Sequence, residues 1–142
     1  MCIRDRNSTR GSWGPVLRTD VIPTGAANLP DGKILAWSAA KKNDFGGSTG
    51  VSTYTTIFNP NNNSFSDRLV TNTNHDMFCP GTANLPDGRI MITGGRTTTK
   101  TTIYDPVQNR YVEEREMNTP RGYQANVTLQ DGRVVVTLNL GE

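Results

Sequence analysis

A tight turn built on Asp-Gly recurs three times and constrains the fold of this chain more than any other feature. It lies within three similar segments, residues 24–38 (TGAANLPDGKILAWS), 81–95 (GTANLPDGRIMITGG) and 124–138 (QANVTLQDGRVVVTL). Each segment reads as a strand of small residues, a turn and an apolar strand. Glycine after Asp suits such a turn because it accepts a positive φ without a Cβ penalty. The chain is therefore predicted to form three equivalent β-hairpins.

A second hairpin pattern falls between these segments. Residues 56–65 (TIFNPNNNSF) and 102–111 (TIYDPVQNRY) each combine a β-rich run, an Asn/Asp-Pro turn and an aromatic strand start. The repeating unit is thus four strands in roughly 45–55 residues, which fits a propeller blade, and the kelch repeat runs to about 50 residues. We expect an all-β, kelch-type β-propeller fragment of about two and a half four-stranded blades. Blade one is placed at about 24–68, blade two at about 79–113 and half of blade three at about 122–138.

Composition agrees with a fold of many turns and a thin core. The 142 residues include 14 Gly and 8 Pro, and their mean hydropathy is −0.54, which suits an all-β protein. The net charge is +2 with scattered basic residues, which argues against nucleic acid or an anionic membrane as a partner. No apolar run approaches the roughly 18 residues that cross a bilayer, and no secretory signal is visible.

The two ends of the chain lead to two further expectations. Residues 1–10 (MCIRDRNSTR) match no element, so we expect a non-native or disordered tail, with a short natural tail as the alternative. The partial propeller is expected over residues 11–142. Because propellers typically close with four to eight blades, two and a half blades predict a fragment of a larger ring.

Two unlike residues share one position of the repeat. Cys79 lies eight positions before Asp87, and Tyr123 lies eight positions before Asp131. Since the first strand of a blade lines the central axis, both should lie near the axis on one face, in adjacent blades. The long loop 39–52 should bring Phe45 to the same face. Taken singly, a cysteine is more often a small buried hydrophobe, and an aromatic residue at such a position more often serves packing.

The remaining candidates favour structural interpretations. His75 is the sole histidine and cannot form a metal site alone, so a hydrogen-bonded structural role is expected. Gly94 and Gly95 resemble strand-end and turn glycines rather than a phosphate loop, because no helix follows them. Four acidic residues are expected to be solvated: Asp76, Glu113, Glu114 and Glu116.

Cysteine usage and sequons add little by themselves. Cys2 and Cys79 give little warrant for a disulfide framework. Asn7, Asn62 and Asn126 begin Asn-X-Ser/Thr sequons, a pattern that is common by chance. Asn126 is expected inside a strand, which argues against its modification.

Two motifs make the sequence specific, residues 75–81 (HDMFCPG) and 121–124 (RGYQ). They resemble galactose oxidase, a family of copper radical alcohol oxidases, and the likeness extends over about residues 11–136. The resemblance implies a secreted protein with seven blades. It further implies that a thioether bond joins Cys79 to Tyr123, that Tyr123 binds copper and carries the radical, and that Phe45 lines the substrate pocket.

The same resemblance implies a reaction. Primary alcohols of galactose or related sugars and polyols would become aldehydes, and O₂ would be reduced to H₂O₂. The cofactors would be copper and the self-derived Cys-Tyr thioether, which the protein positions and tunes. The family takes its other copper ligands from later blades and a following domain, so we expect the isolated chain to be inactive. After Thr137 the sequence reads LNLGE and lacks the glycine pair and tryptophan that the family has there.

Two alternatives stay open at this point. One is a non-catalytic kelch propeller that binds carbohydrate or protein through one face. The other is an aldehyde oxidase resembling glyoxal oxidase. Fold analogy alone licenses none of these functions.

Overall fold

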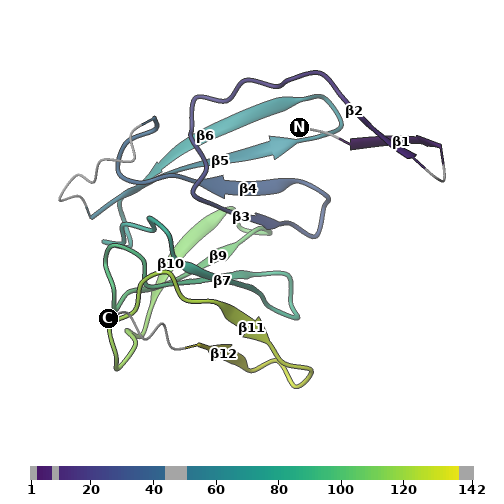
Figure 1. Ribbon diagram of the computed structural model, residues 1–142. Helices are drawn as coiled ribbons and strands as arrows, with labels where there is room; N and C mark the ends of the chain where they lie inside the picture. Colours follow the sequence, from purple (N-terminus) through teal and green to yellow (C-terminus); the bar gives the residue numbers. More distant parts are fainter. Residues whose placement is uncertain (1–2, 8–9, 44–50, 138–142) are drawn as a thin grey trace.

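Every regular element of the structure is a β-strand (Figure 1). The computed structural model describes residues 3–7, 10–43 and 51–137. The first four-stranded antiparallel sheet comprises β3 (Gly25–Asn28), β4 (Ile34–Trp37), β5 (Thr53–Asn59) and β6 (Ser64–Val70). The second comprises β7 (Gly81–Asn84), β8 (Ile90–Thr93), β9 (Thr101–Asp105) and β10 (Arg110–Glu114). A two-stranded sheet follows, made of β11 (Asn126–Thr128) and β12 (Val134–Val136). The predicted all-β fold, with two full blades and half of a third, is confirmed.

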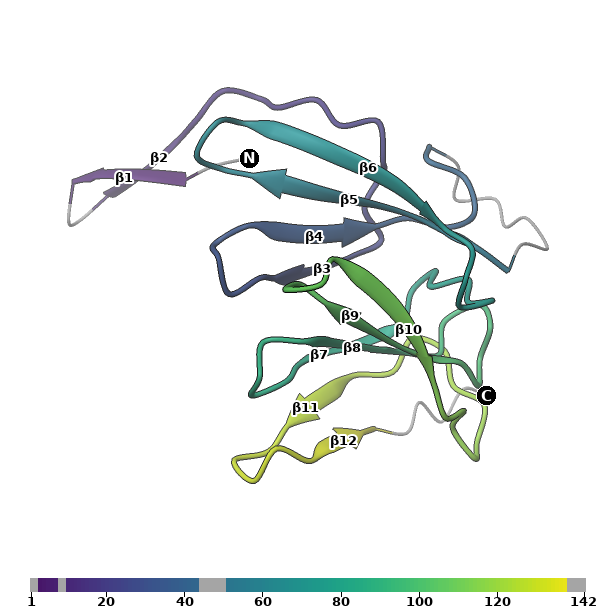
Figure 2. The same cartoon turned by 180° about the vertical axis from the view of Figure 1, so that it is seen from behind.

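The first strands of the three sheets lie next to one another. β7 contacts β3 on one side and β11 on the other, and the sheets fan out from this inner edge (Figures 1 and 2). The Nδ2 atom of Asn84 donates to the carbonyl oxygen of Asn28 at 2.7 Å, and the hydroxyl of Thr128 donates to the carbonyl oxygen of Asn84 at 2.7 Å. The same inner-strand contact is thus made twice, as expected for blades around a common axis.

The three Asp-Gly turns have one conformation. Gly32, Gly88 and Gly132 have φ values of 80°, 86° and 85°. Each donates its N–H to the carbonyl oxygen of the leucine three residues earlier, at 2.9–3.0 Å. This is the three-residue hairpin loop, a turn closed by glycine in the left-handed region. The prediction of three equivalent hairpins is confirmed.

The hydrophobic core lies between the first two blades. Ile90 and Ile92 of β8 are fully buried, and they join Leu35 and Trp37 of β4 in one cluster with Met77 from the connection between the blades. Alternate residues of a strand point to opposite faces, so Ile90 and Ile92 share the face toward blade one. Burying each such aliphatic side chain contributes roughly 1.5–3 kcal/mol. The interface between the blades is therefore a main source of stability.

The N-terminal segment differs from the sequence expectation. Residues 1–10 were expected to match no element, whereas β1 (Ile3–Asn7) pairs with β2 (Arg10–Trp13) in an antiparallel sheet. This sheet extends away from the blades (Figure 1). A periodic side-chain pattern is what predicts a half-buried strand, and a pair stabilised by its own backbone hydrogen bonds needs none. Whether the segment is native stays a prediction.

No helix in the described parts of the chain is long and apolar enough to span a bilayer.

Candidate functional site

Cys79 and Tyr123 share an uncommon backbone conformation. Five non-glycine residues among those described have positive φ, and three of them are asparagines, which tolerate the left-handed region. The other two are Cys79 at 53° and Tyr123 at 56°. A bulky residue in this region is strained by about 1–3 kcal/mol, and such strain gathers at functional sites. The two positions that the repeat equates are thus also the two backbone outliers.

These two residues meet in space. The backbone N–H of Tyr123 donates to the carbonyl oxygen of Cys79 at 3.2 Å. Cys79 is a free, half-buried thiol, and the Tyr123 side chain is 72% exposed. Both precede the first strand of their sheet, on the face opposite the Asp-Gly turns. The predicted proximity of the two residues, in adjacent blades and on one face, is confirmed, and their chemical roles stay predictions.

Gly94 and Gly95 join the segments that carry the two residues. Their φ values are 60° and 97°, and Gly95 N–H donates to the carbonyl oxygen of Arg121 at 3.2 Å. A Cβ on Gly95 would lie 2.7 Å from the carbonyl oxygen of Phe78, and a Cβ on Gly94 would overlap the carbonyl oxygen of Arg121. Only glycine lets the three chain segments approach this closely. The sequence interpretation of these glycines as strand-end and turn residues is confirmed, and the structure adds their role in the contact.

Asp76 is fully buried beneath the segment that leads to Cys79. Its Oδ1 accepts a hydrogen bond from the backbone N–H of Phe78 at 3.2 Å, and its own N–H donates to the Thr97 hydroxyl at 2.9 Å. Oδ2 is buried with no hydrogen-bond partner among the described residues. Burial raises the pKa of this carboxyl above its usual value of 3.8. The Asp76 side chain therefore closes an Asx turn with Phe78, directly before Cys79.

The expectation that Asp76 is solvated is consequently wrong. Its sequence neighbourhood is polar, but residues about 20 positions later along the chain fold over it, as the Thr97 contact shows. Glu113, Glu114 and Glu116 are exposed as expected. Glu113 and Glu116 form ion pairs with Lys100 at 2.5 and 2.8 Å.

His75 is a structural histidine, as the sequence predicted. Its ring is fully buried, with Nε2 2.7 Å from the carbonyl oxygen of Gly94 and Nδ1 2.8 Å from the Thr102 hydroxyl. A carbonyl oxygen only accepts, so Nε2 carries the proton and Nδ1 accepts from the hydroxyl. Burial holds the pKa of the imidazole below its usual 6.5. Both nitrogens are thus occupied, and neither is available to a metal.

Gln124 supports the other half of the site and was not singled out from the sequence. It is buried directly after Tyr123, and its Nε2 donates to the carbonyl oxygen and the hydroxyl of Thr93, at 2.6 and 3.1 Å. This contact links the entry to β11 with the end of β8. The signal available beforehand was the motif RGYQ itself, which contains Gln124.

The described residues do not complete a copper site. No group of three or more His, Cys, Asp or Glu side chains within 3–7, 10–43 and 51–137 could hold a metal ion. The phenol of Tyr123 is one suitable oxygen donor, and copper also favours imidazole. His75 is already engaged through both nitrogens. A copper centre at Tyr123 would therefore need ligands from outside these residues.

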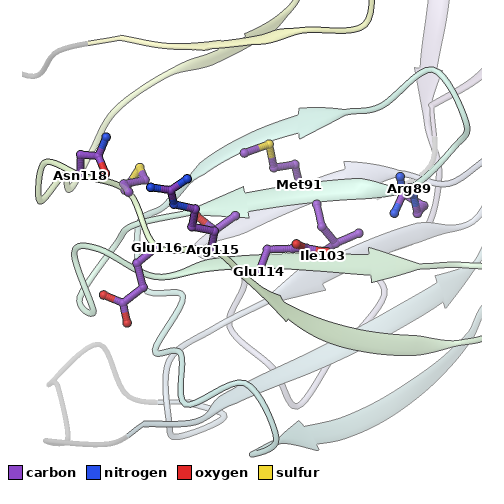
Figure 3. Close-up of a pocket in the computed structure, with 9 residues that line it drawn as sticks. Arg89, Met91, Ile103, Glu114, Arg115, Glu116 and Asn118 are labelled. Carbon is purple, nitrogen blue, oxygen red and sulfur yellow. The ribbon is translucent and has the colours of Figure 1, made fainter.

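Two further features lie apart from this pair. Phe45, the predicted wall of a substrate pocket, lies outside the described residues. A groove of about 610 Å³ runs along β8 and β9 and is lined by Met91 and Ile103, among others (Figure 3). Neither Cys79 nor Tyr123 lines it. The Cys79–Tyr123 pair is thus separate from this groove.

Comparison with known proteins places this geometry in a family. The chain is 42% identical over 125 residues to galactose oxidase of Gibberella zeae strain PH-1. The aligned residues make up 87% of this chain and 18% of that protein. A second galactose oxidase from Gibberella zeae matches equally. Among solved structures, a novel fungal alcohol oxidase of the AA5 family, in complex with copper, superposes with a TM-score of 0.79 at 38% identity. That match covers 89% of this chain and 27% of the oxidase.

No family model matches the chain. The two galactose oxidases and the copper-bound alcohol oxidase agree, and their alignments cover nearly all of this sequence. The chain spans less than a fifth of the length of the curated relatives, so it corresponds to a portion of their fold. By sequence and by fold, this β-propeller segment belongs to the galactose oxidase family.

Proposed function

We propose that this segment is part of a copper radical oxidase that converts primary alcohols, such as galactose or related sugars and polyols, to aldehydes. The overall reaction transfers two electrons and two protons from the alcohol to O₂, which gives H₂O₂. The observation that carries the proposal is the contact between Cys79 and Tyr123, both with left-handed backbones. The family relationship supports the same chemistry.

In this proposal, Cys79 and Tyr123 form the organic half of the cofactor. A carbon–sulfur bond replaces the S–H of Cys79 and an ortho C–H of the Tyr123 ring, and O₂ takes up the two hydrogen atoms. The sulfur substituent donates electron density to the ring, so the phenol is more easily oxidised to its radical. Copper chemistry belongs to the complete protein, because the described residues offer the metal one donor, the Tyr123 oxygen. Phe45 would line the substrate pocket.

The partners follow from this reaction. They are a small-molecule alcohol, O₂, the remainder of the propeller and a following domain. The complete protein is proposed to be secreted. By itself, the 142-residue chain is proposed to be inactive. We infer no role in binding nucleic acid or membranes.

Peptide mass analysis tests the proposal. The complete gene product is loaded with copper in air and digested, and we expect a linked peptide pair containing Cys79 and Tyr123 that lacks two hydrogens. Unlinked peptides in a copper-loaded, aerated sample would rule out the radical oxidase. The non-catalytic propeller predicts unlinked peptides, and an aldehyde oxidase predicts the link together with H₂O₂ from aldehydes rather than alcohols.

A further inference from the structure

One of the three sequons lies in an exposed turn. Asn62 belongs to the connection between β5 and β6, and Ser64 is the first residue of β6. Residues 60–64 are all exposed. The turn lies at the end of blade one that carries its Asp-Gly turn, away from the entries to β7 and β11 (Figure 2). A large group attached here would project into solvent and would leave the Cys79–Tyr123 end open.

The side chains of this sequon are arranged around the Asn62 amide. Its Oδ1 accepts two hydrogen bonds from Ser64, one from the backbone N–H at 3.1 Å and one from the hydroxyl at 2.7 Å. No described residue accepts a hydrogen bond from Nδ2, the atom that an N-linked sugar would modify. The serine hydroxyl thus binds the asparagine amide and leaves its nitrogen available.

The sheet holds the turn firmly on both sides. Phe58 and Phe65 face each other across β5 and β6, with ring centroids 4.9 Å apart. Asn59 Oδ1 accepts from Asn61 N–H at 3.0 Å, and Asn63 takes the positive φ that the turn requires. The conformation that presents Asn62 therefore depends on strand pairing that a surface sugar does not disturb.

The sequon at Asn126 is the opposite case. Its Nδ2 donates to the Thr93 hydroxyl at 3.0 Å, and its amide lies directly over Gly81 in the contact between the inner strands. Thr128, the hydroxyl residue of this sequon, donates to Asn84 instead of Asn126. A sugar on Asn126 would separate β7 from β11. The third sequon begins at Asn7 and continues into residues outside the described part.

We propose that Asn62 is a site of N-glycosylation. The Nδ2 atom forms a bond to the anomeric carbon of the first N-acetylhexosamine of a lipid-diphosphate-linked oligosaccharide. The bond from that carbon to the diphosphate breaks, the lipid diphosphate leaves, and Nδ2 loses one proton, with no change in oxidation state. The inference rests on the secretory route that is part of the proposed function.

The test uses the complete gene product secreted from a fungal host behind a secretory leader. Peptide-N-glycosidase in heavy-oxygen water converts each glycosylated asparagine to labelled aspartate, which peptide mapping locates. We expect label at Asn62 and none at Asn126. Asn62→Gln and Ser64→Ala should abolish the label, whereas Ser64→Thr and the neighbouring control Asn61→Gln should retain it.

Two outcomes would overturn the proposal: an unlabelled Asn62 in secreted protein, or label at Asn126 in folded protein. All four substitutions are at exposed residues of the turn or of the first position of β6, so secreted yield and thermal unfolding should match the parent. The same digest reports the Cys79–Tyr123 link independently. A labelled Asn62 with an unlinked pair would contradict the oxidase and leave the glycosylation site standing.

Discussion

The backbone N–H of Tyr123 donates to the carbonyl oxygen of Cys79 at 3.2 Å, and both residues lie in the left-handed region of φ. A left-handed conformation costs an L-residue roughly 1–2 kcal/mol. Because equivalent positions of neighbouring blades both adopt this unfavourable conformation, the surrounding residues must impose it. Asp76 fixes the backbone before Cys79 through its hydrogen bond to Phe78 N–H, and Gln124 fixes the backbone directly after Tyr123 through its hydrogen bond to Thr93.

Removing the sulfur or the phenol should separate chemistry from folding. In the complete protein, we expect Cys79→Ser and Tyr123→Phe to abolish both alcohol oxidation and the linked peptide. In the 142-residue chain by itself, the thiol is half-buried and the tyrosine exposed, so there the urea midpoint should change little. Peroxide assays and peptide mass analysis measure the first two effects. Full activity in Cys79→Ser would contradict a role for the thioether.

Gly95→Ala should destabilise the contact between the blades more than a matched glycine change. Gly95 and Gly32 both have positive φ, but a Cβ on Gly95 lies 2.7 Å from the Phe78 carbonyl oxygen, whereas a Cβ on Gly32 meets nothing within 4 Å. Gly32→Ala should lower the free energy of unfolding by about 1–2 kcal/mol because of its positive φ alone. Gly95→Ala should lower it further, because its Cβ also meets the Phe78 carbonyl oxygen. Urea unfolding compares them, and Gly95→Ala should also lower the yield of linked peptide. Equal costs would mean that the close approach is unimportant.

Asp76 is expected to matter as a hydrogen-bond acceptor and not as a charge. Asp76→Asn keeps an oxygen for the Phe78 N–H, whereas Asp76→Ala leaves that donor unpaired at a cost of about 1–3 kcal/mol. Since burial raises the pKa of Asp76, the folded form holds its proton more tightly, and stability is lost as pH rises above the unfolded value near 3.8.

The Asp76→Asn variant should therefore lose less stability between pH 4 and pH 7 than the parent does. Urea midpoints at the two pH values test this. If Asp76→Asn is as unstable as Asp76→Ala at pH 7, the carboxylate charge is required and the acceptor role is refuted.

His75 should make the protein less stable in mild acid. Burial lowers the pKa of His75 below 6.5, so on acidification the unfolded chain binds a proton before the folded chain does. This contribution to stability falls as pH drops from 7 toward 5, by at most about 1.4 kcal/mol per pH unit. The histidine is the only one in these 142 residues, so His75→Gln should flatten this part of the profile while lowering stability at pH 7. If the urea midpoints of the parent and of His75→Gln change with pH in parallel, His75 is not held neutral in the folded protein.

Much of the fold could be predicted from local pattern. The Asp-Gly turns recur with a fixed spacing to their strands, and each turn is stabilised by contacts within a few residues, including Asp31 with Lys33 at 2.7 Å. The strand of small residues before each turn and the apolar strand after it likewise indicated the hairpins. The pairing of β1 with β2 carries no such side-chain period and was missed.

The candidate site divides in the same way. The sequence by itself determined that Cys79 and Tyr123 are equivalent positions, because the repeat fixes their distance from each turn. It also identified His75 as structural, since one histidine is too few for a metal site. Only the tertiary structure decided that Asp76 is buried and that Gly94 and Gly95 hold the two segments together. It also decided that Asn62 is exposed, whereas the amide of Asn126 is hydrogen-bonded to Thr93. Those properties depend on which distant segments fold against a residue, and a local pattern does not encode that.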